Sequence, residues 1–213
     1  MRVAVRTVGI FEENSYLVID EATNRAVFID PGDEPEKLLA MLRESGASLE
    51  AIWLTHAHLD HVGAIAGIRR VHDVPVYLHP ADLPLYTRAD AQAAAYGIPF
   101  EQPDPPDRQL ADGESVSVGS LAFDVIHVPG HAPGHVVFRH GDIVFGGDLL
   151  FAGSIGRTDL PLADPIAMEA SLARICELDD AVAVHPGHGP STTIGQERAT
   201  NPFLTGAARI VRR

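Results

Sequence analysis

The residues whose types and spacing point to chemistry begin with the stretch Thr55-His56-Ala57-His58-Leu59-Asp60-His61. His56 and His58 are two residues apart, so their side chains project to the same side only from an extended backbone. The pair therefore differs from the helical i, i+4 histidine pair of a zincin. Because the stretch directly follows the apolar residues Ile52-Trp53-Leu54, the pattern predicts metal ligands at the end of a strand.

Three more candidate ligands follow apolar segments in the same way. Val125–Val128 leads to Pro129-Gly130-His131, Ile143–Phe145 to Gly146-Gly147-Asp148, and Ala181–Val184 to His185-Pro186-Gly187-His188. Functional sites form at the edge where strands finish and loops begin, and glycine lets the backbone approach such a site closely. We therefore expect these side chains to meet the first histidine group at one edge of a sheet.

The combined set has seven candidate metal ligands: His56, His58, Asp60, His61, His131, Asp148 and His188. Five imidazoles and two carboxylates without a thiolate suit zinc, iron or manganese. Seven ligands are too many for one tetrahedral ion, so the set predicts two divalent ions, zinc first, with iron or manganese as alternatives. Two such ions share a carboxylate, lie roughly 3.5–4 Å apart and generate a nucleophilic hydroxide at neutral pH.

The elements that must position these ligands alternate between short strands and helices. Periodicity and turn residues predict strands at 16–19, 26–30, 49–55, 74–78, 115–118, 121–128, 135–138, 143–145 and 181–185. Helices are expected at 35–43 with Gly46 beyond the end, at 62–71, at 165–178 with Asp164 as the cap, and at 195–200. Residues 80–109 predict short helices and a proline-rich connection.

Length and composition restrict the class of protein. The 213 residues are 46% hydrophobic, and 16 basic and 29 acidic residues give a formal charge of −13, with Lys37 as the only lysine. This balance argues against a nucleic-acid-binding protein. One cysteine, Cys176, excludes an intramolecular disulfide scaffold, and we expect it to pack in the core. The sequence shows neither an apolar run of about 20 residues nor a signal-peptide core, which predicts a cytoplasmic protein without membrane contact.

The motifs together resemble the metallo-β-lactamase fold superfamily, specifically a small glyoxalase II-like (hydroxyacylglutathione hydrolase-like) member. The resemblance rests on Asp30-Pro31-Gly32, His56–His61, Pro129-Gly130-His131, Gly147-Asp148 and Gly187-His188-Gly189. It implies an α/β (α+β) four-layer αβ/βα sandwich with the metal site at one edge of the two sheets. It also implies that His56, His58 and His131 hold the first ion. Asp60, His61 and His188 would hold the second, with Asp148 bridging.

The resemblance also sets expectations for the substrate. It implies a single domain over residues 1–213, without the C-terminal helical region that helps full-length glyoxalase II to bind glutathione. After the bridging aspartate that family places a lysine and a tyrosine for the carboxylate of the thiol. Here the stretch reads Gly156-Arg157-Thr158-Asp159, so Arg157 is the expected substrate-binding cation and the tyrosine is missing. The same stretch also resembles persulfide dioxygenases, an iron-using branch of the superfamily.

The function expected from this resemblance is hydrolysis of a hydroxyacyl-thiol thioester such as S-lactoylglutathione. A hydroxide shared between the metals would attack the carbonyl, while Asp60 and Asp148 fix the metal geometry and orient the nucleophile. Three alternatives stay open: a one-iron persulfide dioxygenase using His56, His131 and Asp148, a lactonase, and a metal-binding protein without catalysis. The expected partner is the small-molecule substrate, with no nucleic acid or membrane, and a homo-oligomer is compatible with the sequence.

Two further residues are expected to support the metal site without binding metal. Asp30 belongs to a turn-forming Asp-Pro-Gly sequence and is expected to brace the metal loop. His135 lies four residues after His131, and we expect it to pack against the ligands or to hold one of them.

Overall fold

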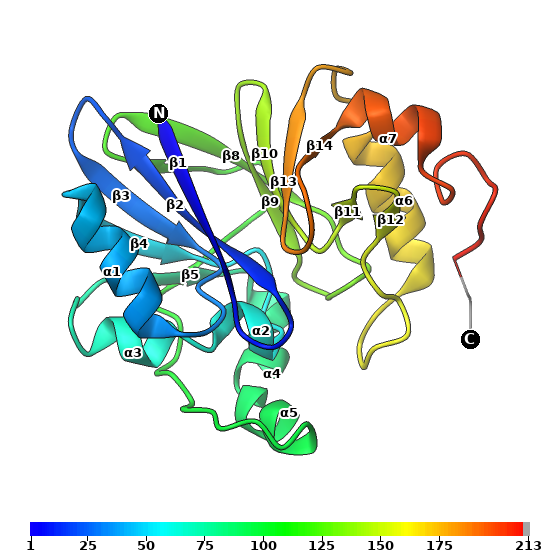
Figure 1. Cartoon of the computed structure of the whole chain (residues 1–213). Helices are drawn as coiled ribbons and strands as arrows, with labels where there is room; N and C mark the ends of the chain where they lie inside the picture. The colour runs from blue at the N-terminus through cyan, green and yellow to red at the C-terminus, as the bar shows by residue number, and fades with distance from the viewer. Residues whose placement is uncertain (211–213) are drawn as a thin grey trace.

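Two six-stranded sheets face each other in the computed structural model, which describes residues 1–210 (Figure 1). The first sheet contains, in spatial order, β1 (Arg2–Val8), β2 (Glu13–Asp20), β3 (Arg25–Ile29), β4 (Ser48–Trp53), β5 (Val76–Leu78) and β6 (Arg108–Gln109). The second runs β14 (Thr192–Thr193), β13 (Ala183–Pro186), β10 (Ile143–Gly147), β9 (Val136–His140), β8 (Leu121–His127) and β7 (Ser115–Val118). Arg212 and Arg213, interpreted from the sequence as solvated charges, lie outside the described residues.

The inner layer of the sandwich is an apolar core between the two sheets. Strand β4 contributes Trp53, whose ring lies 5.3 Å from that of Phe123 on β8 and 5.3 Å from that of Phe138 on β9, centroid to centroid. Within the first sheet, β1, β2 and β3 pair antiparallel, whereas β3 to β6 pair parallel. The parallel strands end at the same edge, which brings the chain after β3 and β4 together.

Helices cover the outer faces of both sheets. On the first sheet α1 (Pro35–Ser45) and α3 (Ile65–Arg69) bury apolar residues that include Leu38 and Ile68. On the second, α6 (Pro165–Ile175) and α7 (Ile194–Thr200) do the same, and Cys176 packs against this core as expected. The order helix, sheet, sheet, helix confirms the predicted four-layer αβ/βα sandwich. No helix among residues 1–210 is long and apolar enough to cross a membrane.

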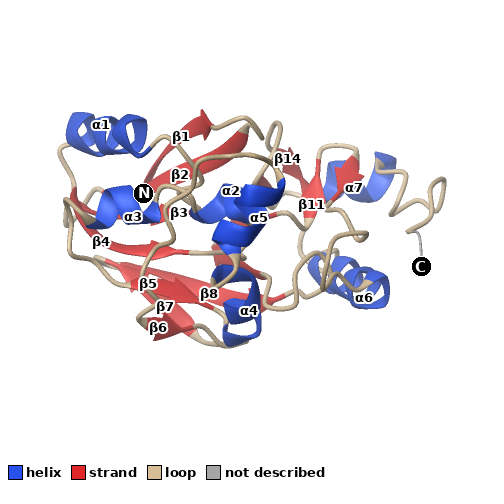
Figure 2. Cartoon of the chain, turned by 90° about the horizontal axis from the view of Figure 1, so that it is seen from below, coloured by secondary structure: helices blue, strands red, loops and turns tan. Residues whose placement is uncertain are grey.

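Short helices lie at the sheet edge where the candidate ligands gather. They are α2 (Leu59–Val62), the 3₁₀ turn η1 (Pro80–Asp82), α4 (Leu83–Tyr86) and α5 (Ala89–Ala95), at the bottom of Figure 1 and facing the viewer in Figure 2. These elements confirm the short helices expected within residues 80–109. They place a helical wall beside the ends of β4 and β8.

The helix predicted at 62–71 is wrong in its extent. The chain forms α2 from Leu59 and then α3 from Ile65, because the backbone N–H of Ala64 donates to the carbonyl of Pro31 and so leaves the helical ladder. Gly63 permits this contact, since a Cβ there would lie 2.4 Å from the carbonyl oxygen of Gly32. A tertiary contact with the Asp-Pro-Gly turn therefore overrides the local helical pattern.

Capping residues fix the other helix ends. The Asp164 side chain accepts hydrogen bonds from the N–H groups of Ile166 and Ala167, and Gly46 ends α1 in the left-handed conformation. Helix α6 ends at Ile175, three residues before the expected end. The hairpin of β11 (Leu150–Phe151) and β12 (Ser154–Ile155), like β14, is too short for hydrophobic periodicity to reveal.

Candidate metal centre

The first ligand cluster consists of His56, His58 and His131. One ring nitrogen from each histidine lies within 4.8 Å of the others, and all three side chains are buried. His58 has an extended backbone (φ −70°, ψ 153°), so the two-residue spacing from His56 brings both rings to one side, as the sequence predicted. His58 Nδ1 lies 2.8 Å from Nε2 of His131, which follows β8. The ends of two sheets thus meet in one imidazole cluster.

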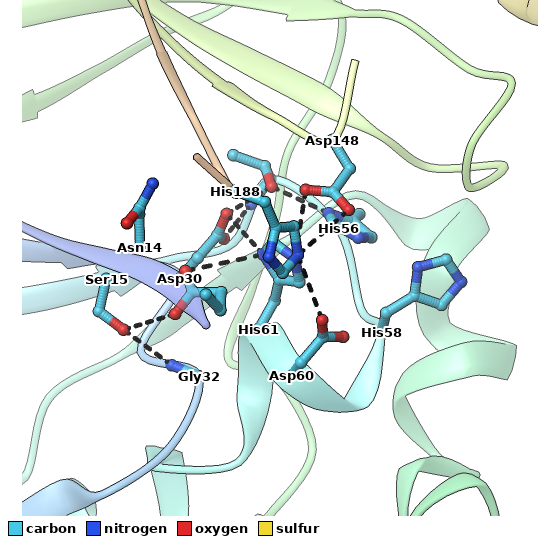
Figure 3. A network of polar contacts seen from close by, with 12 residues as sticks. Asn14, Ser15, Asp30, Gly32, His56, His58, Asp60, His61, Asp148 and His188 are labelled. Carbon is cyan, nitrogen blue, oxygen red and sulfur yellow. Dashed lines mark hydrogen bonds and ion pairs between the residues drawn. The ribbon is translucent and has the colours of Figure 1, made fainter. Parts of the chain in front are cut away.

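The second cluster consists of Asp60, His61 and His188. Its ligand atoms also lie within 4.8 Å of one another, and His188 Nε2 is 3.3 Å from Asp60 Oδ2 (Figure 3). Asp60 and His61 lie on the single turn of α2, whereas His188 follows β13. The Asn14 side chain of β2 holds the His188 loop by donating to the carbonyl of Gly189.

Asp148 lies between the two clusters. Its Oδ2 is 3.4 Å from Nε2 of His131 in the first cluster and 3.5 Å from Nε2 of His188 in the second. Its Oδ1 is 3.5 Å from His61 Nε2. The position after β10 therefore puts one carboxylate within reach of both groups, which is where the family resemblance would place a bridging residue.

Buried atoms without hydrogen-bond partners show that this centre fits metal ions. Among the described residues, His56 Nε2, His61 Nε2 and Asp148 Oδ1 are buried and make no hydrogen bond. Buried polar atoms are otherwise almost always paired, because leaving them unpaired is costly. Imidazole nitrogens and carboxylate oxygens that converge in this way are the donors that zinc, iron and manganese accept.

Asp30 braces the centre, as its position in the Asp-Pro-Gly turn predicted. Its carboxylate accepts hydrogen bonds from the Thr55 N–H at 2.7 Å and the Thr55 hydroxyl at 2.6 Å. Its Oδ2 also lies 3.1 Å from His61 Nδ1. A proton on His61 Nδ1 then leaves Nε2 free to face Asp148, which is how outer carboxylates orient metal-binding histidines.

Two other contacts orient candidate ligand residues without being ligands themselves. The Arg157 carbonyl accepts a hydrogen bond from His131 Nδ1 at 2.8 Å, which leaves Nε2 of that ring facing Asp148. His135 Nε2 accepts the backbone N–H of Asp148 at 3.0 Å, and its ring stacks on His56 at 4.9 Å. His135 therefore packs against one ligand and holds the backbone of another, as expected.

Asp82 supports the first cluster, and the sequence analysis missed it. Its buried carboxylate accepts hydrogen bonds from the N–H of Ala57, between two ligands, and from the N–H of Gly134, three residues after His131. Burial raises the pKa of Asp82 to about 6, although both hydrogen bonds act in the opposite direction. The only sequence signal was an aspartate just after a proline at the start of a short helix.

Glu13 is the second missed residue and lies behind the second cluster. Its side chain is 1% exposed on β2, and Oε2 accepts the Ser15 hydroxyl at 2.8 Å. Its Oε1 has no hydrogen-bond partner among the described residues and is 3.9 Å from His61 Nδ1. Burial raises the pKa of Glu13 well above its usual range, with a further contribution from the Asp30 carboxylate. The sequence favoured a solvated charge at Glu13, and this interpretation is wrong because the side chain is buried.

The two clusters impose opposite pKa shifts on their histidines. In the first, burial lowers the pKa of His58 to about 3 and that of His131 to about 4. In the second, burial also disfavours the charge of His61, but the Asp148 and Asp30 carboxylates outweigh it and raise the pKa. The same balance, with Asp60 as the main carboxylate partner, raises the pKa of His188.

A cavity of about 790 Å³ opens beside both clusters. Its lining includes His58 and His131 from the first cluster and Asp60, His188 and Asp148, together with residues of α4 and α5. Its volume is in the range of small-molecule sites. Arg157, the expected substrate-binding cation, also lines it, with Nε 2.9 Å and Nη2 3.0 Å from the Asp159 carboxylate.

Comparison with known proteins identifies the family. Residues 8–191 match the model of the metallo-beta-lactamase superfamily, so the chain belongs to this superfamily and to its metal-dependent hydrolases. It is 37% identical to a protein of Haemophilus influenzae named hydroxyacylglutathione hydrolase GloC, over 96% of this chain and 98% of that protein.

Two solved structures are similar over nearly the whole chain. TTHA1623 in a di-iron-bound form is 53% identical, with a TM-score of 0.88, covering 94% of this chain and 100% of that one. The BLEG-1 B3 metallo-beta-lactamase is 37% identical, with a TM-score of 0.89, covering 96% and 100%. These likenesses confirm the fold, whereas the relatives bear different names and therefore leave the substrate open.

Proposed function

We propose that this chain is a binuclear metal hydrolase that cleaves thioesters of hydroxyacyl-thiol conjugates resembling S-lactoylglutathione. The observation that carries the proposal is the convergence of seven imidazole and carboxylate side chains beside the 790 Å³ cavity. Three of their atoms are buried without a hydrogen-bond partner among the described residues. The relative named hydroxyacylglutathione hydrolase supports this choice of substrate class.

The proposed ligand sets follow the two clusters. His56, His58 and His131 would hold the first ion, Asp60, His61 and His188 the second, and Asp148 both. Zinc is the metal that the donor set suits first, and the di-iron form of a 53% identical structure makes iron the direct competitor. When bound, such ions polarise a thioester carbonyl and lower the pKa of water, which supplies a nucleophile at neutral pH.

The chain's own residues would position the ligands and the substrate. Asp30 and the Arg157 carbonyl fix the rings of His61 and His131, so that neither has to reorient during turnover. His135 fixes the backbone of Asp148. Asp60 and Asp148 would keep the ligand geometry and accept hydrogen bonds from the attacking water, which orients its lone pair toward the carbonyl.

The leaving group explains why a thioester suits this site. A thiol has a pKa near 8.5, so its thiolate departs without a strong general acid. The cavity lining contains no lysine or glutamate, and its only aspartates are the candidate ligands Asp60 and Asp148. Glu13 does not line the cavity either. An ester or amide with a more basic leaving group would depend more strongly on a general acid, for which the described lining outside the candidate ligands offers only the Tyr96 hydroxyl.

A persulfide dioxygenase with one iron is the second candidate. The di-iron form of the 53% identical structure supports iron as the metal, although that form holds two ions and this candidate one. In that case His56, His131 and Asp148 would form the iron-binding triad. Lactones and, given the BLEG-1 likeness, β-lactams are further substrates for the same test.

The experiment that tests the proposal combines metal analysis with turnover. Protein purified without added metal should contain two ions per chain and hydrolyse S-lactoylglutathione faster than a lactone or a β-lactam. Oxygen uptake with a thiol persulfide, measured at an oxygen electrode, should stay at background. One iron per chain with persulfide-dependent oxygen uptake would contradict the hydrolase and establish the dioxygenase.

A further inference from the structure

One face of helix α5 (Ala89–Ala95) forms part of the cavity wall. Arg88, the residue that precedes this helix, lines the cavity together with Ala91, Gln92 and Ala95. These positions are three, four and seven residues after Arg88, so they lie on the same side of the helix. The opposite side buries Ala89 and Ala93 in the protein. The helix therefore presents one cation and a surface of small residues to the cavity.

Arg88 differs from every other charged residue of the cavity lining. Asp60 and Asp148 belong to the metal centre, and Arg157 has two of its nitrogens 2.9 and 3.0 Å from the Asp159 carboxylate. Arg88 makes no ion pair and no side-chain hydrogen bond with any described residue. In a protein with a formal charge of −13, an exposed arginine without a carboxylate partner is available to an anionic ligand.

The rest of the cavity away from the metal centre is mainly apolar. Leu85 of α4, Phe11 from the β1–β2 turn and Leu162 line it. The Phe11 ring meets the Tyr96 ring edge-on at 5.5 Å, which joins the β1–β2 turn to the end of α5. Tyr96 and Leu162 are each 58% exposed, so apolar surface continues to the cavity mouth. A ligand that fills this space must itself be largely apolar.

The conformation of Leu162 is a second sign that this wall is shaped for a ligand. Its φ of 68° is in the left-handed region, which a leucine rarely adopts. Backbone strain of this kind is concentrated at ligand sites, where the surrounding structure maintains it. Leu162 is one of the exposed apolar residues of the cavity lining.

We propose that Arg88 is an anion-binding residue and that the substrate is a thioester with an apolar chain ending in one carboxylate. This inference rests on the proposed thioesterase function and names its substrate class more narrowly. The thioester would lie at the metal centre, the apolar chain along Ala91, Ala95 and Leu85, and the carboxylate at Arg88. Arg157, which the sequence analysis favoured, has its guanidinium already engaged by Asp159.

The test compares matched thioesters on the metal-loaded protein. The lactoyl thioesters of 6-mercaptohexanoate and of 6-mercaptohexanamide differ only in the terminal charge. We expect the carboxylate to raise kcat/KM roughly tenfold, mainly through a lower KM, as for a charge-assisted hydrogen bond in a partly desolvated cavity. The ratio should shrink at high ionic strength. The kcat/KM for S-lactoylglutathione should not exceed that for the mercaptohexanoate thioester. A tenfold higher value for S-lactoylglutathione would contradict the proposed apolar chain of the substrate.

Variants assign the preference to a residue. Arg88→Gln should reduce the carboxylate-to-amide ratio to about one, and Arg88→Lys should keep part of it because the charge is retained. Arg43→Gln, on α1 and outside the cavity, is the matched control that keeps the ratio. Loss of the ratio in Arg157→Gln with retention in Arg88→Gln would overturn the assignment.

A binding measurement separates this inference from the thioesterase proposal. S-butyl-6-mercaptohexanoate and its amide are thioethers that cannot be hydrolysed, and isothermal titration gives their dissociation constants. Stronger binding of the carboxylate that requires Arg88, without hydrolysis of any thioester, would support the subsite and contradict the thioesterase. Hydrolysis of both lactoyl thioesters with equal kcat/KM would support the thioesterase and contradict the subsite.

Discussion

The two ligand clusters of the candidate metal centre shift the pKa values of their histidines in opposite directions. The first has three buried imidazoles, and burial lowers the pKa of His58 to about 3 and that of His131 to about 4. The second includes a carboxylate, and its neighbouring aspartates raise the pKa values of His61 and His188. The carboxylate neighbours, and not burial alone, thus decide whether a histidine keeps its proton to higher pH or loses it at low pH and can bind metal.

Each cluster also has its own outer carboxylate. Asp82 ties the loops of the first cluster through the N–H groups of Ala57 and Gly134, whereas Asp30 contacts Thr55 and the His61 ring of the second. Asp148 contacts both clusters, and Asp30 also has a ligand atom within 4.8 Å of His56 in the first cluster. We therefore expect Asp82 variants to perturb the first cluster and Asp30 variants mainly the second, whereas Asp148 variants should perturb both.

The largest loss of metal and activity is expected on substitution of Asp148, whose carboxylate contacts both clusters. Asp148→Asn removes the charge and one acceptor oxygen from both groups, so metal content and turnover should fall together. We expect kcat for S-lactoylglutathione to drop roughly 1,000-fold, since several kcal/mol of transition-state stabilisation depend on the ions. Metal analysis and steady-state kinetics measure both quantities. Asp142→Asn in the exposed β9–β10 turn is the control, and two retained metals with full turnover in Asp148→Asn would contradict the assignment.

Substitutions of the outer carboxylates Asp30 and Asp82 should lower the affinity for different metal ions. Asp30→Asn should weaken the second ion roughly 10–100-fold and Asp82→Asn the first, because an amide cannot accept all the hydrogen bonds that each carboxylate accepts. Metal titration calorimetry gives the two affinities, and crystallography of each half-loaded variant identifies the lost ion. If both variants weaken the same ion, the two-cluster description is wrong.

Acidification should remove the second ion first. Because the pKa values of His61 and His188 are raised, these imidazoles bind protons at higher pH than usual. Protons therefore compete with the second ion as pH falls from neutral. The lowered values of His58 and His131 mean that protons compete with the first ion only near pH 3–4. Metal content after dialysis at pH 8 to 5 should therefore fall from two ions to one. Simultaneous loss of both ions in this range would contradict the difference between the clusters.

The smallest effect on activity and metal affinity is expected on substitution of Glu13, which lies behind the second cluster. Burial raises the pKa of Glu13 well above its usual range, which favours the neutral carboxyl, so the isosteric Glu13→Gln should preserve most of its interactions. We expect kcat/KM and second-ion affinity to change less than about threefold. A loss above tenfold in the calorimetric affinity would show that Glu13 acts as an anion beside His61.

The candidate ligands could be predicted from the sequence because each group of them follows the end of a strand. His131, Asp148 and His188 all come after an apolar run and a glycine turn, and parallel or neighbouring strands bring such ends together. The two-residue spacing of His56 and His58 requires an extended backbone, which the structure has. Residue type, local period and position were sufficient to predict mixed strands and helices and the place of the candidate site, whereas the four-layer sandwich was predicted from the family resemblance.

The supporting residues could not be predicted, because long-range contacts define their roles. Asp82 acts through backbone groups 25 and 52 residues away, and no local pattern distinguishes it from a surface aspartate. The break between α2 and α3 likewise depends on the Ala64 N–H bonding to Pro31 across the fold. The sequence could not distinguish Arg88 from Arg157 as the anion-binding residue, because the distinction depends on where Asp159 lies and on which residues line the cavity.

Anomalous diffraction distinguishes two ions in two unlike clusters joined by Asp148 from other metal arrangements. Crystals of protein purified without added metal should be measured on both sides of the zinc and iron absorption edges. We expect two anomalous peaks roughly 3.5–4 Å apart, one among His56, His58 and His131 and the other among Asp60, His61 and His188. A single peak, or a second peak away from Asp60, His61 and His188, would contradict it.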